Sequence, residues 1–123
     1  MYPFTNSKQE LLWRKAMDLA IAVNHCVRNF PQHEREKKGL YSQLLQTSIR
    51  ITFRIVESQT PILDSERDIL LRARYHLSET EFLLDVSHIH GYIDKSDRLR
   101  LNENCQELRS LINKEIQDST IYN

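Results

Sequence analysis

Residues 40–59 constrain the fold more than any other stretch of this chain, because their apolar side chains surround more than half of a helix. The stretch reads LYSQLLQTSIRITFRIVESQ and holds no glycine or proline. At 100° per residue, its apolar and small positions cover an arc of about 220°. A helix that faces one core needs a stripe of roughly 100° or a little more. We therefore expect a helix here that contacts more than its own bundle.

Glycine and proline are scarce along the whole chain, which favours long helices joined by few turns. The 123 residues include two Gly and three Pro. Pro31 and Pro61 each end an apolar pattern, and Gly91 suits a helix C-cap. The breaks leave four amphipathic stretches, at about residues 7–29, 40–59, 64–90 and 95–117. We expect an all-α fold, an antiparallel up-down four-helix bundle that forms a single domain over residues 1–123.

The segments between and beyond these stretches are short and polar. Residues 1–6 are expected as a tail, residues 32–38 as a charged loop or frayed turn, and residues 118–123 as a frayed tail. No secretory signal is present, and no stretch reaches the roughly 18 apolar residues that a membrane span needs. Cys26 and Cys105 are far apart and are expected as free thiols on core faces. We expect a cytoplasmic protein with no membrane partner.

The stretch at 64–90 is apolar on two opposite sides. One stripe includes Ile69, Ala73 and Leu77, and a second stripe lies across the helix from it. Since apolar burial is worth about 25 cal/mol per Å², we expect a homo-oligomer whose interface uses both middle helices. A single core with wide faces is the alternative. The candidate interface residues are Ile49, Phe53, Leu71, Tyr75, Phe82, Val86 and Ile89.

No residue pattern predicts a catalytic, cofactor or metal site. The chain has no Gly-rich phosphate loop, no CxxC pair and no G-x-S-x-G motif. His76 has Arg72 and Thr80 one turn away, and neither Glu79 nor Glu81 has a His three residues later. We expect His76 to be a histidine at the core edge, hydrogen-bonded within the bundle. We expect no enzyme, no cofactor and no metal.

Arginine side chains are the better indication of a partner. Arg50 and Arg54 lie one turn apart on the polar strip of residues 40–59, and Arg72 and Arg74 lie on the next helix. Repeated around a symmetric oligomer, these four candidate nucleic-acid contacts could hold phosphates. The chain has 17 Lys+Arg and 17 Asp+Glu, so its net charge is zero. An ordinary solvated face, balanced by acidic neighbours, therefore remains an open alternative.

Short motifs between Leu12 and Ile116 follow the spacing of a known protein family. They are Trp13, Ala16, Leu19, Phe30-Pro31, Gly39-Leu40, Gln43-Leu44, Ile51, Ile55, Glu57, Ala73, Leu77, Glu79, Glu81 and Gly91-Tyr92. By these residues the chain resembles the four-helix-bundle family of the 23S rRNA intervening-sequence proteins. The resemblance implies a ring-like homo-oligomer, commonly a pentamer.

The chain departs from this family in one segment, and the departure limits what the resemblance implies. From Gln43 the family typically reads Q-L-R-R-A-A-V-S-I-P-S-N-I-A-E-G, whereas Thr52, Arg54 and Ser58 stand here for its Pro, Asn and Gly. The fold is therefore expected to carry over, but no role specific to that segment.

The family is also similar in fold to the accessory variability protein of diversity-generating retroelements, a non-enzymatic partner of a reverse transcriptase and its RNA. The resemblance thus implies a non-enzymatic oligomeric scaffold or accessory protein. It would bind RNA or a ribonucleoprotein partner such as a reverse transcriptase. A purely protein-binding oligomeric scaffold with no nucleic-acid contact is the alternative.

Overall fold

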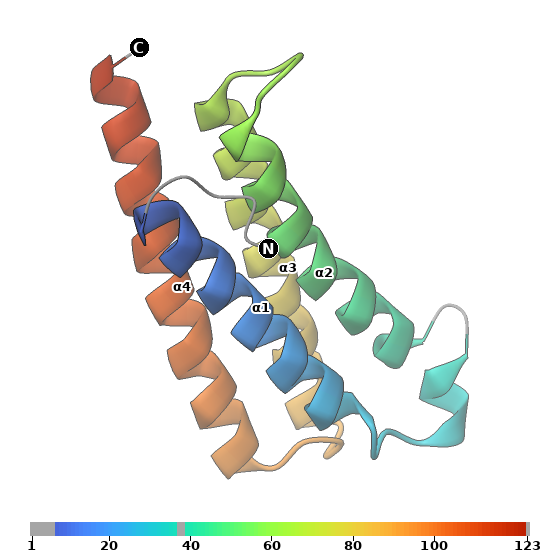
Figure 1. The fold of residues 1–123 in the computed structure, drawn as a ribbon. Helices are drawn as coiled ribbons and strands as arrows, with labels where there is room; N and C mark the ends of the chain where they lie inside the picture. Colours follow the sequence, from blue (N-terminus) through green and yellow to red (C-terminus); the bar gives the residue numbers. More distant parts are fainter. Residues whose placement is uncertain (1–6, 37–38, 123) are drawn as a thin grey trace.

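The computed structural model describes residues 7–36 and 39–122, and every regular element in these ranges is a helix. Four α-helices and one short 3-10 helix follow one another along the chain (Figure 1). Their bounds are α1 Ser7–Val27, η1 Gln32–Arg35, α2 Leu40–Gln59, α3 Glu66–Ile89 and α4 Lys95–Tyr122. No helix within the described ranges is long and apolar enough to cross a membrane.

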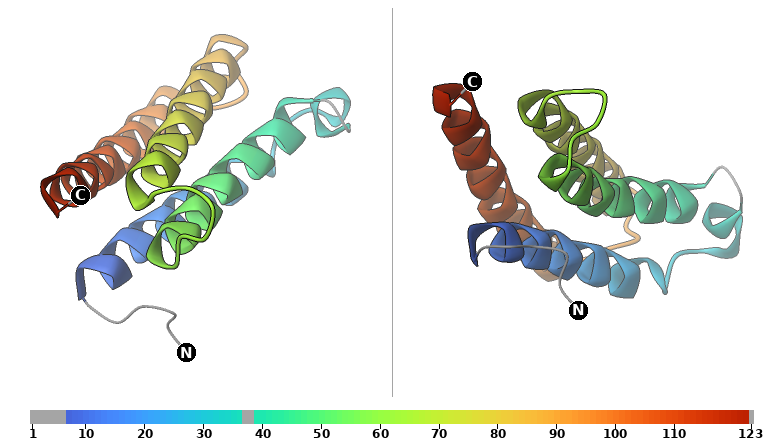
Figure 2. Two further views of the ribbon diagram at one scale, coloured as in Figure 1. Left: turned by 90° about the horizontal axis from the view of Figure 1, so that it is seen from above. Right: turned by 45° about the horizontal axis from the view of Figure 1, so that its top comes forward.

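The four long helices form a bundle in which each helix packs against two others. α1 and α3 each contact both α2 and α4, and the diagonal pairs make no contact over the described residues (Figures 1 and 2). Two ion pairs join α1 to α4: Lys8 to Asp118 at 3.3 Å and Lys15 to Glu107 at 2.7 Å. α1 and α4 are therefore antiparallel.

The core takes one stripe of side chains from each helix. Because these residues recur every three or four positions, they share one face of their helix. The fully buried members include Leu12, Ala16, Leu19, Val23, Leu44, Ile51, Ile55, Ala73, Leu77, Leu84, Leu101, Cys105, Leu108 and Ile112. The expected core stripes are thus confirmed.

Local capping sets where α3 and α4 begin. The Ser65 hydroxyl accepts a hydrogen bond from the Asp68 backbone N–H at 3.1 Å, and the Asp94 carboxylate accepts one from the Asp97 N–H at 2.7 Å. Each bond satisfies a backbone donor that has no partner within the helix. Gly91, with a φ of 78°, follows α3 and lets the chain turn toward α4.

The expected end of α4 was wrong. α4 continues to Tyr122, past the expected end near residue 117, because its last turns are held in the bundle. Ser119 is buried and donates to the carbonyl of Ile116 at 2.8 Å. At the other boundaries, α1 ends at Val27, and Gln32–Arg35 forms the helix η1 inside the expected loop. Residues 1–6 of the expected tail and 37–38 of the loop lie outside the described residues.

Candidate assembly and nucleic-acid surface

α2 carries apolar side chains on its outer face as well as in the core. Ile49 and Phe53 are 58% and 61% exposed, and Val56 is half-buried. Spacings of four and three residues place these three on one side of α2. That side is turned roughly 150° from Thr47, which bonds to α3. The wide apolar arc of residues 40–59 is therefore only partly covered by the bundle.

α3 carries a second uncovered stripe, on the side away from its core residues. Tyr75, Phe82 and Ile89 recur every seven residues and are 63–80% exposed. Leu71 and Val86 lie half-buried beside them. The alternative that one wide core buries all of these apolar side chains is therefore wrong for Tyr75, Phe82 and Ile89, which remain in solvent.

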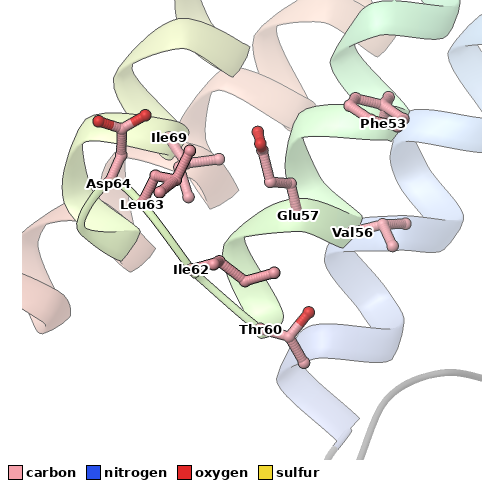
Figure 3. A pocket seen from close by; sticks show the side chains of 8 residues that line it. All are labelled: Phe53, Val56, Glu57, Thr60, Ile62, Leu63, Asp64 and Ile69. Carbon is pink, nitrogen blue, oxygen red and sulfur yellow. The ribbon is translucent and has the colours of Figure 1, made fainter.

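A hollow of about 340 Å³ lies where α2 ends and α3 begins (Figure 3). Ile62 and Leu63, in the connecting loop, are 91% and 94% exposed at its edge. The sequence interpretation missed both residues, although two apolar residues directly after Pro61 were a usable signal. The full lining is Phe53, Val56, Glu57, Thr60, Ile62, Leu63, Asp64 and Ile69.

Uncovered apolar side chains are concentrated on the hairpin formed by α2, the loop and α3. Of ten exposed large apolar residues in the described part of the chain, seven lie between Leu40 and Ile89. These seven are Ile49, Phe53, Ile62, Leu63, Tyr75, Phe82 and Ile89. The other three, Leu11, Ile21 and Leu99, are divided between α1 and α4. The outer surface of the α2–α3 half of the bundle is therefore far more apolar than the outer surface of the α1–α4 half.

The four candidate arginines do not form one group. Arg50 is exposed and has no ion pair among the described residues. Arg54 pairs with Glu57 at 2.9 Å, and Arg72 pairs with Asp64 at 2.7 Å. Arg74 instead faces α4, where it donates to the Asn113 side-chain oxygen at 2.8 Å. Three of the arginines thus lie toward the α2–α3 contact, and the fourth lies on another face.

Two arginines and two carboxylates form a balanced group beside the hollow. The hydrogen bond and charge of Arg72 lower the pKa of the Asp64 carboxyl, and Arg54 adds a smaller effect in the same direction. The pKa of Arg72 is raised, first by Asp64 and to a lesser degree by Glu57. The charges of Arg54 and Arg72 are thus neutralised by those of Glu57 and Asp64. Of the three candidate arginines near the α2–α3 contact, Arg50 is the one with no paired carboxylate among the described residues.

A polar cluster holds α2 against α3. The Thr47 hydroxyl donates to the His76 carbonyl at 3.2 Å and lies 3.4 Å from the Glu79 carboxylate. The His76 Nδ1 lies 2.7 Å from the same carboxylate. The expected hydrogen-bonded role of His76 is confirmed. On a helical wheel Thr47 falls among the polar positions of residues 40–59, yet it is only 3% exposed, because a carbonyl on α3 satisfies its hydroxyl.

Both thiols are held in their unreactive form. Burial raises the pKa of Cys26 to about 11 and that of Cys105 to about 12. The thiolate is the nucleophile, so both groups are protonated at neutral pH and act as packing groups, as expected. Among the residues described, no three His, Cys, Asp or Glu side chains are grouped so that they could hold a metal ion.

These observations define the class of protein: an all-α four-helix bundle with uncovered apolar surface on its α2–α3 hairpin. Residues 8–114 match the family model described as 23S rRNA-intervening sequence protein. The chain belongs to this family, and the resemblance inferred from its motifs is confirmed to that extent. No curated protein matches the chain.

One solved structure supports the same fold. It is a crystal structure, at 1.70 Å, of a protein of unknown function from the S23 ribosomal protein family of Bacteroides thetaiotaomicron. The two proteins are 20% identical and superpose with a TM-score of 0.79, over 90% of this chain and 99% of that chain. At this identity the similarity establishes the fold alone.

Proposed function

We propose that this protein is a non-enzymatic homo-oligomeric scaffold or accessory protein of the cytoplasm. It binds RNA or a ribonucleoprotein partner such as a reverse transcriptase. The observation that carries the proposal is the concentration of uncovered apolar side chains on the α2–α3 hairpin. Membership of a family named for an intervening sequence of 23S rRNA supports an RNA partner. Two free, unreactive cysteines suit a reducing compartment.

The exposed apolar side chains supply much of the area that subunit contacts need. Covering all seven, at roughly 150 Å² each, removes on the order of 1,000 Å² per subunit from water. A ring divides this area between two contacts, so about 500 Å² falls in each, against about 800 Å² per partner in a standard protein interface. Because the net charge is zero, copies of the chain would not repel one another as they approach.

The proposed assembly is a ring, most simply a pentamer, of antiparallel up-down bundles. The two ion pairs between α1 and α4 show that these helices are antiparallel, which supports the up-down arrangement. In such a ring every subunit presents the same charged groups at the same radius, so one Arg50 per subunit becomes a ring of positive charge.

Light scattering at micromolar concentration tests the assembly. We expect a mass that is a whole multiple of the 14.7 kDa chain, and five times that mass for the pentamer. Leu99→Glu, on α4 outside the hairpin, should leave the mass of the assembly unchanged, since Leu99 is one of the three exposed apolar residues away from α2 and α3. A wild-type protein that stays at the mass of one chain would contradict the proposal.

Arg50 is the candidate contact on which the RNA part of the proposal is best tested. In filter binding with single-stranded RNA, we expect the Arg50→Gln variant to bind more weakly than the wild type. Its affinity should also depend less steeply on salt, with the slope smaller by about one unit for each phosphate that the variant no longer neutralises. Lys114→Gln is the matched control, because Lys114 is exposed on α4 and lies outside the α2–α3 face.

Three further variants separate the remaining candidates. Arg54→Gln and Arg72→Gln should weaken RNA binding less than Arg50→Gln, because their charges are already paired with carboxylates. Arg74→Gln tests the face toward α4. An Arg50 variant that binds RNA as the wild type does would remove that residue from the role.

A purely protein-binding scaffold is the second candidate function. The pairing of Arg54 and Arg72 with carboxylates and the net charge of zero favour it. The two candidates differ in their need for RNA. If no RNA binds even at low salt, and a partner protein purified from the host stays bound after nuclease treatment, the protein-binding function replaces the RNA-binding one.

A further inference from the structure

We propose that the end of the bundle formed by η1 and the turn between α3 and α4 is a stacking platform for an unpaired base of single-stranded RNA. The platform consists of the rings of His33, His90 and Tyr92 and the guanidinium of Arg35. Figure 1 shows η1 and this turn at the same end of the bundle. The inference rests on the proposed RNA-binding function and names a second RNA contact, which acts by stacking where Arg50 acts by charge.

Tyr92 is the fixed centre of the platform. Its ring packs on the buried Phe30 ring, with centroids 5.5 Å apart, and its hydroxyl lies 3.3 Å from Nε2 of His33. Desolvation and a hydrogen bond to the Glu34 carboxylate raise the pKa of Tyr92, so its phenol stays protonated. These contacts come from segments far from Tyr92 in sequence. The ring is therefore held in one position before any ligand arrives, which lowers the cost of binding.

His90 extends this centre into solvent as a second flat ring. The planes of His90 and Tyr92 differ by 18° and their centroids are 5.6 Å apart, which is a stacked arrangement. His33 meets the Tyr92 ring edge-on, at 72° and 6.3 Å. Both histidines are exposed, and no second ring stacks on His90 among the described residues. An unpaired base is a flat ring of similar size, so it can continue the stack.

Arg35 adds a positive charge to the same end of the bundle. Its guanidinium lies over the Tyr41 ring, 4.8 Å from the centroid, and its Nη1 donates to the Arg28 carbonyl at 2.6 Å. Arg35 is exposed, and no carboxylate pairs with it in the described part of the chain. A guanidinium can stack on a base or neutralise the phosphate beside it. The two side chains that hold Arg35 thus keep its charge available to a nucleotide.

Charge and exposure together favour a nucleotide as the ligand of this platform. The net charge of the chain is zero, so bulk attraction of phosphates is weak and a short-range contact has to contribute. Stacking on aromatic rings supplies such a contact for single strands, whatever their sequence. Packing within the bundle accounts for the buried Phe30 and the half-buried Tyr92. It does not account for the exposed His90 ring, which a base would cover.

Fluorescence anisotropy with labelled oligoadenylate and oligouridylate tests the platform. We expect His90→Ala to bind oligoadenylate roughly tenfold more weakly than the wild type, because one base loses its stacking partner. The loss should be smaller for oligouridylate, since preferences among single strands follow stacking strength. The dependence of affinity on salt should stay the same, because no phosphate contact is removed. Arg50→Gln should instead reduce the salt dependence, so the two kinds of contact are distinguished.

Two further variants are controls for this measurement. His90→Phe keeps a flat ring and should bind oligoadenylate nearly as the wild type does. His25→Ala removes an exposed histidine on α1 that stacks on no ring in the described ranges, so it should not change binding. Wild-type affinity in His90→Ala, or an equal loss in His90→Phe, would overturn the stacking platform. If circular dichroism shows His90→Ala to be unfolded, His90→Asn, which also lacks a ring, replaces it.

The same titrations separate the inference from the proposed function. A wild-type protein that binds neither oligonucleotide at low salt defeats RNA binding itself, and the platform with it. A wild-type protein that binds RNA, and is weakened by Arg50→Gln while His90→Ala has no effect, leaves the RNA-binding function standing and rejects only the stacking platform.

Discussion

Two glycines and two cysteines show how single residues are constrained here by different physical causes. At Gly39 the constraint is space, because an added Cβ would overlap the backbone of Glu34 in η1. At Gly91 the constraint is conformation: φ is 78°, and an added Cβ would meet nothing nearby. For Cys26 and Cys105 the constraint is burial, which keeps the thiols protonated.

The glycine constraints predict different losses of stability. Gly91→Ala should lower the free energy of unfolding by about 1 kcal/mol, since left-handed geometry is unfavourable for an L-residue. Gly91→Asn should lose less, because asparagine tolerates this region. Gly39→Ala should lose more than Gly91→Ala, because the backbone of η1 must move. Urea unfolding of the three variants measures the order, and equal losses at both glycines would contradict these causes.

The thiols should react slowly in the folded protein. With pKa values of about 11 and 12, Cys26 and Cys105 hold almost no thiolate at pH 8. We expect labelling by a thiol reagent to be slow at pH 8 and to be fast once denaturant unfolds the chain and returns the pKa values to their ordinary range. Because Cys105 is more deeply buried, Cys26 should be modified first. Rapid labelling of Cys105 in the folded state would contradict its burial.

At the scale of the element, the helices begin where side chains cap them and continue where tertiary contacts support them. Ser65 and Asp94 are capping residues next to the first turn of their helix. The starts expected from the sequence, at about residues 64 and 95, lie within two residues of the observed starts of α3 and α4. The end of α4 was missed although Ile116 and Ser119, near that end, are buried in the bundle. The sequence pattern around residue 117 does not reveal that burial.

Removing either cap should destabilise the bundle by a similar amount. We expect Ser65→Ala and Asp94→Ala each to lower the free energy of unfolding by about 1 kcal/mol, because a backbone N–H loses its partner. Ser110→Ala, at an exposed position inside α4, is the control and should change stability little. Thermal unfolding followed by circular dichroism makes the comparison, and a loss at Ser110 equal to those at the caps would argue against capping as the cause.

For the whole molecule, the arrangement of the helices buries one stripe of α3 and leaves the other in solvent. Leu77 is fully buried in the core, whereas Phe82, five residues later, is 66% exposed. The first side chain therefore contributes to folding of one chain, and the second is available for contact between chains. On α2, likewise, Ile51 is buried in the core and Phe53 is exposed.

This division predicts that two large-to-small substitutions on one helix will have different effects. Leu77→Ala should lower the free energy of unfolding by about 2–5 kcal/mol, since it leaves a cavity in the core. Phe82→Ala should change the folding of a single chain little and should weaken the association of subunits in the proposed oligomer. Urea unfolding and sedimentation velocity measure the two effects. A Phe82→Ala variant that unfolds as readily as Leu77→Ala would place Phe82 in the core instead.

The sequence by itself determined the helices, their core stripes and the presence of surplus apolar surface on residues 40–59 and 64–90. It could do so because hydrophobic periodicity is local: each side chain's direction depends on its position along its own helix. The family followed from motifs at fixed spacing, for the same reason. The same periodicity selected Ile49 and Phe53 as candidate interface residues, and the bundle leaves both side chains exposed.

Only the tertiary structure decided which part of each arc is covered and which charges are paired. Thr47 is buried because α3 brings the carbonyl of His76 to its hydroxyl. Arg72 is neutralised because the loop before α3 places Asp64 beside it, whereas Arg50 has no such carboxylate among the residues described. The loop residue Ile62 remains uncovered because no described helix of its own chain packs over it. These outcomes depend on contacts outside the regular pattern of one helix, either with another helix or with a loop, and helical periodicity does not contain them.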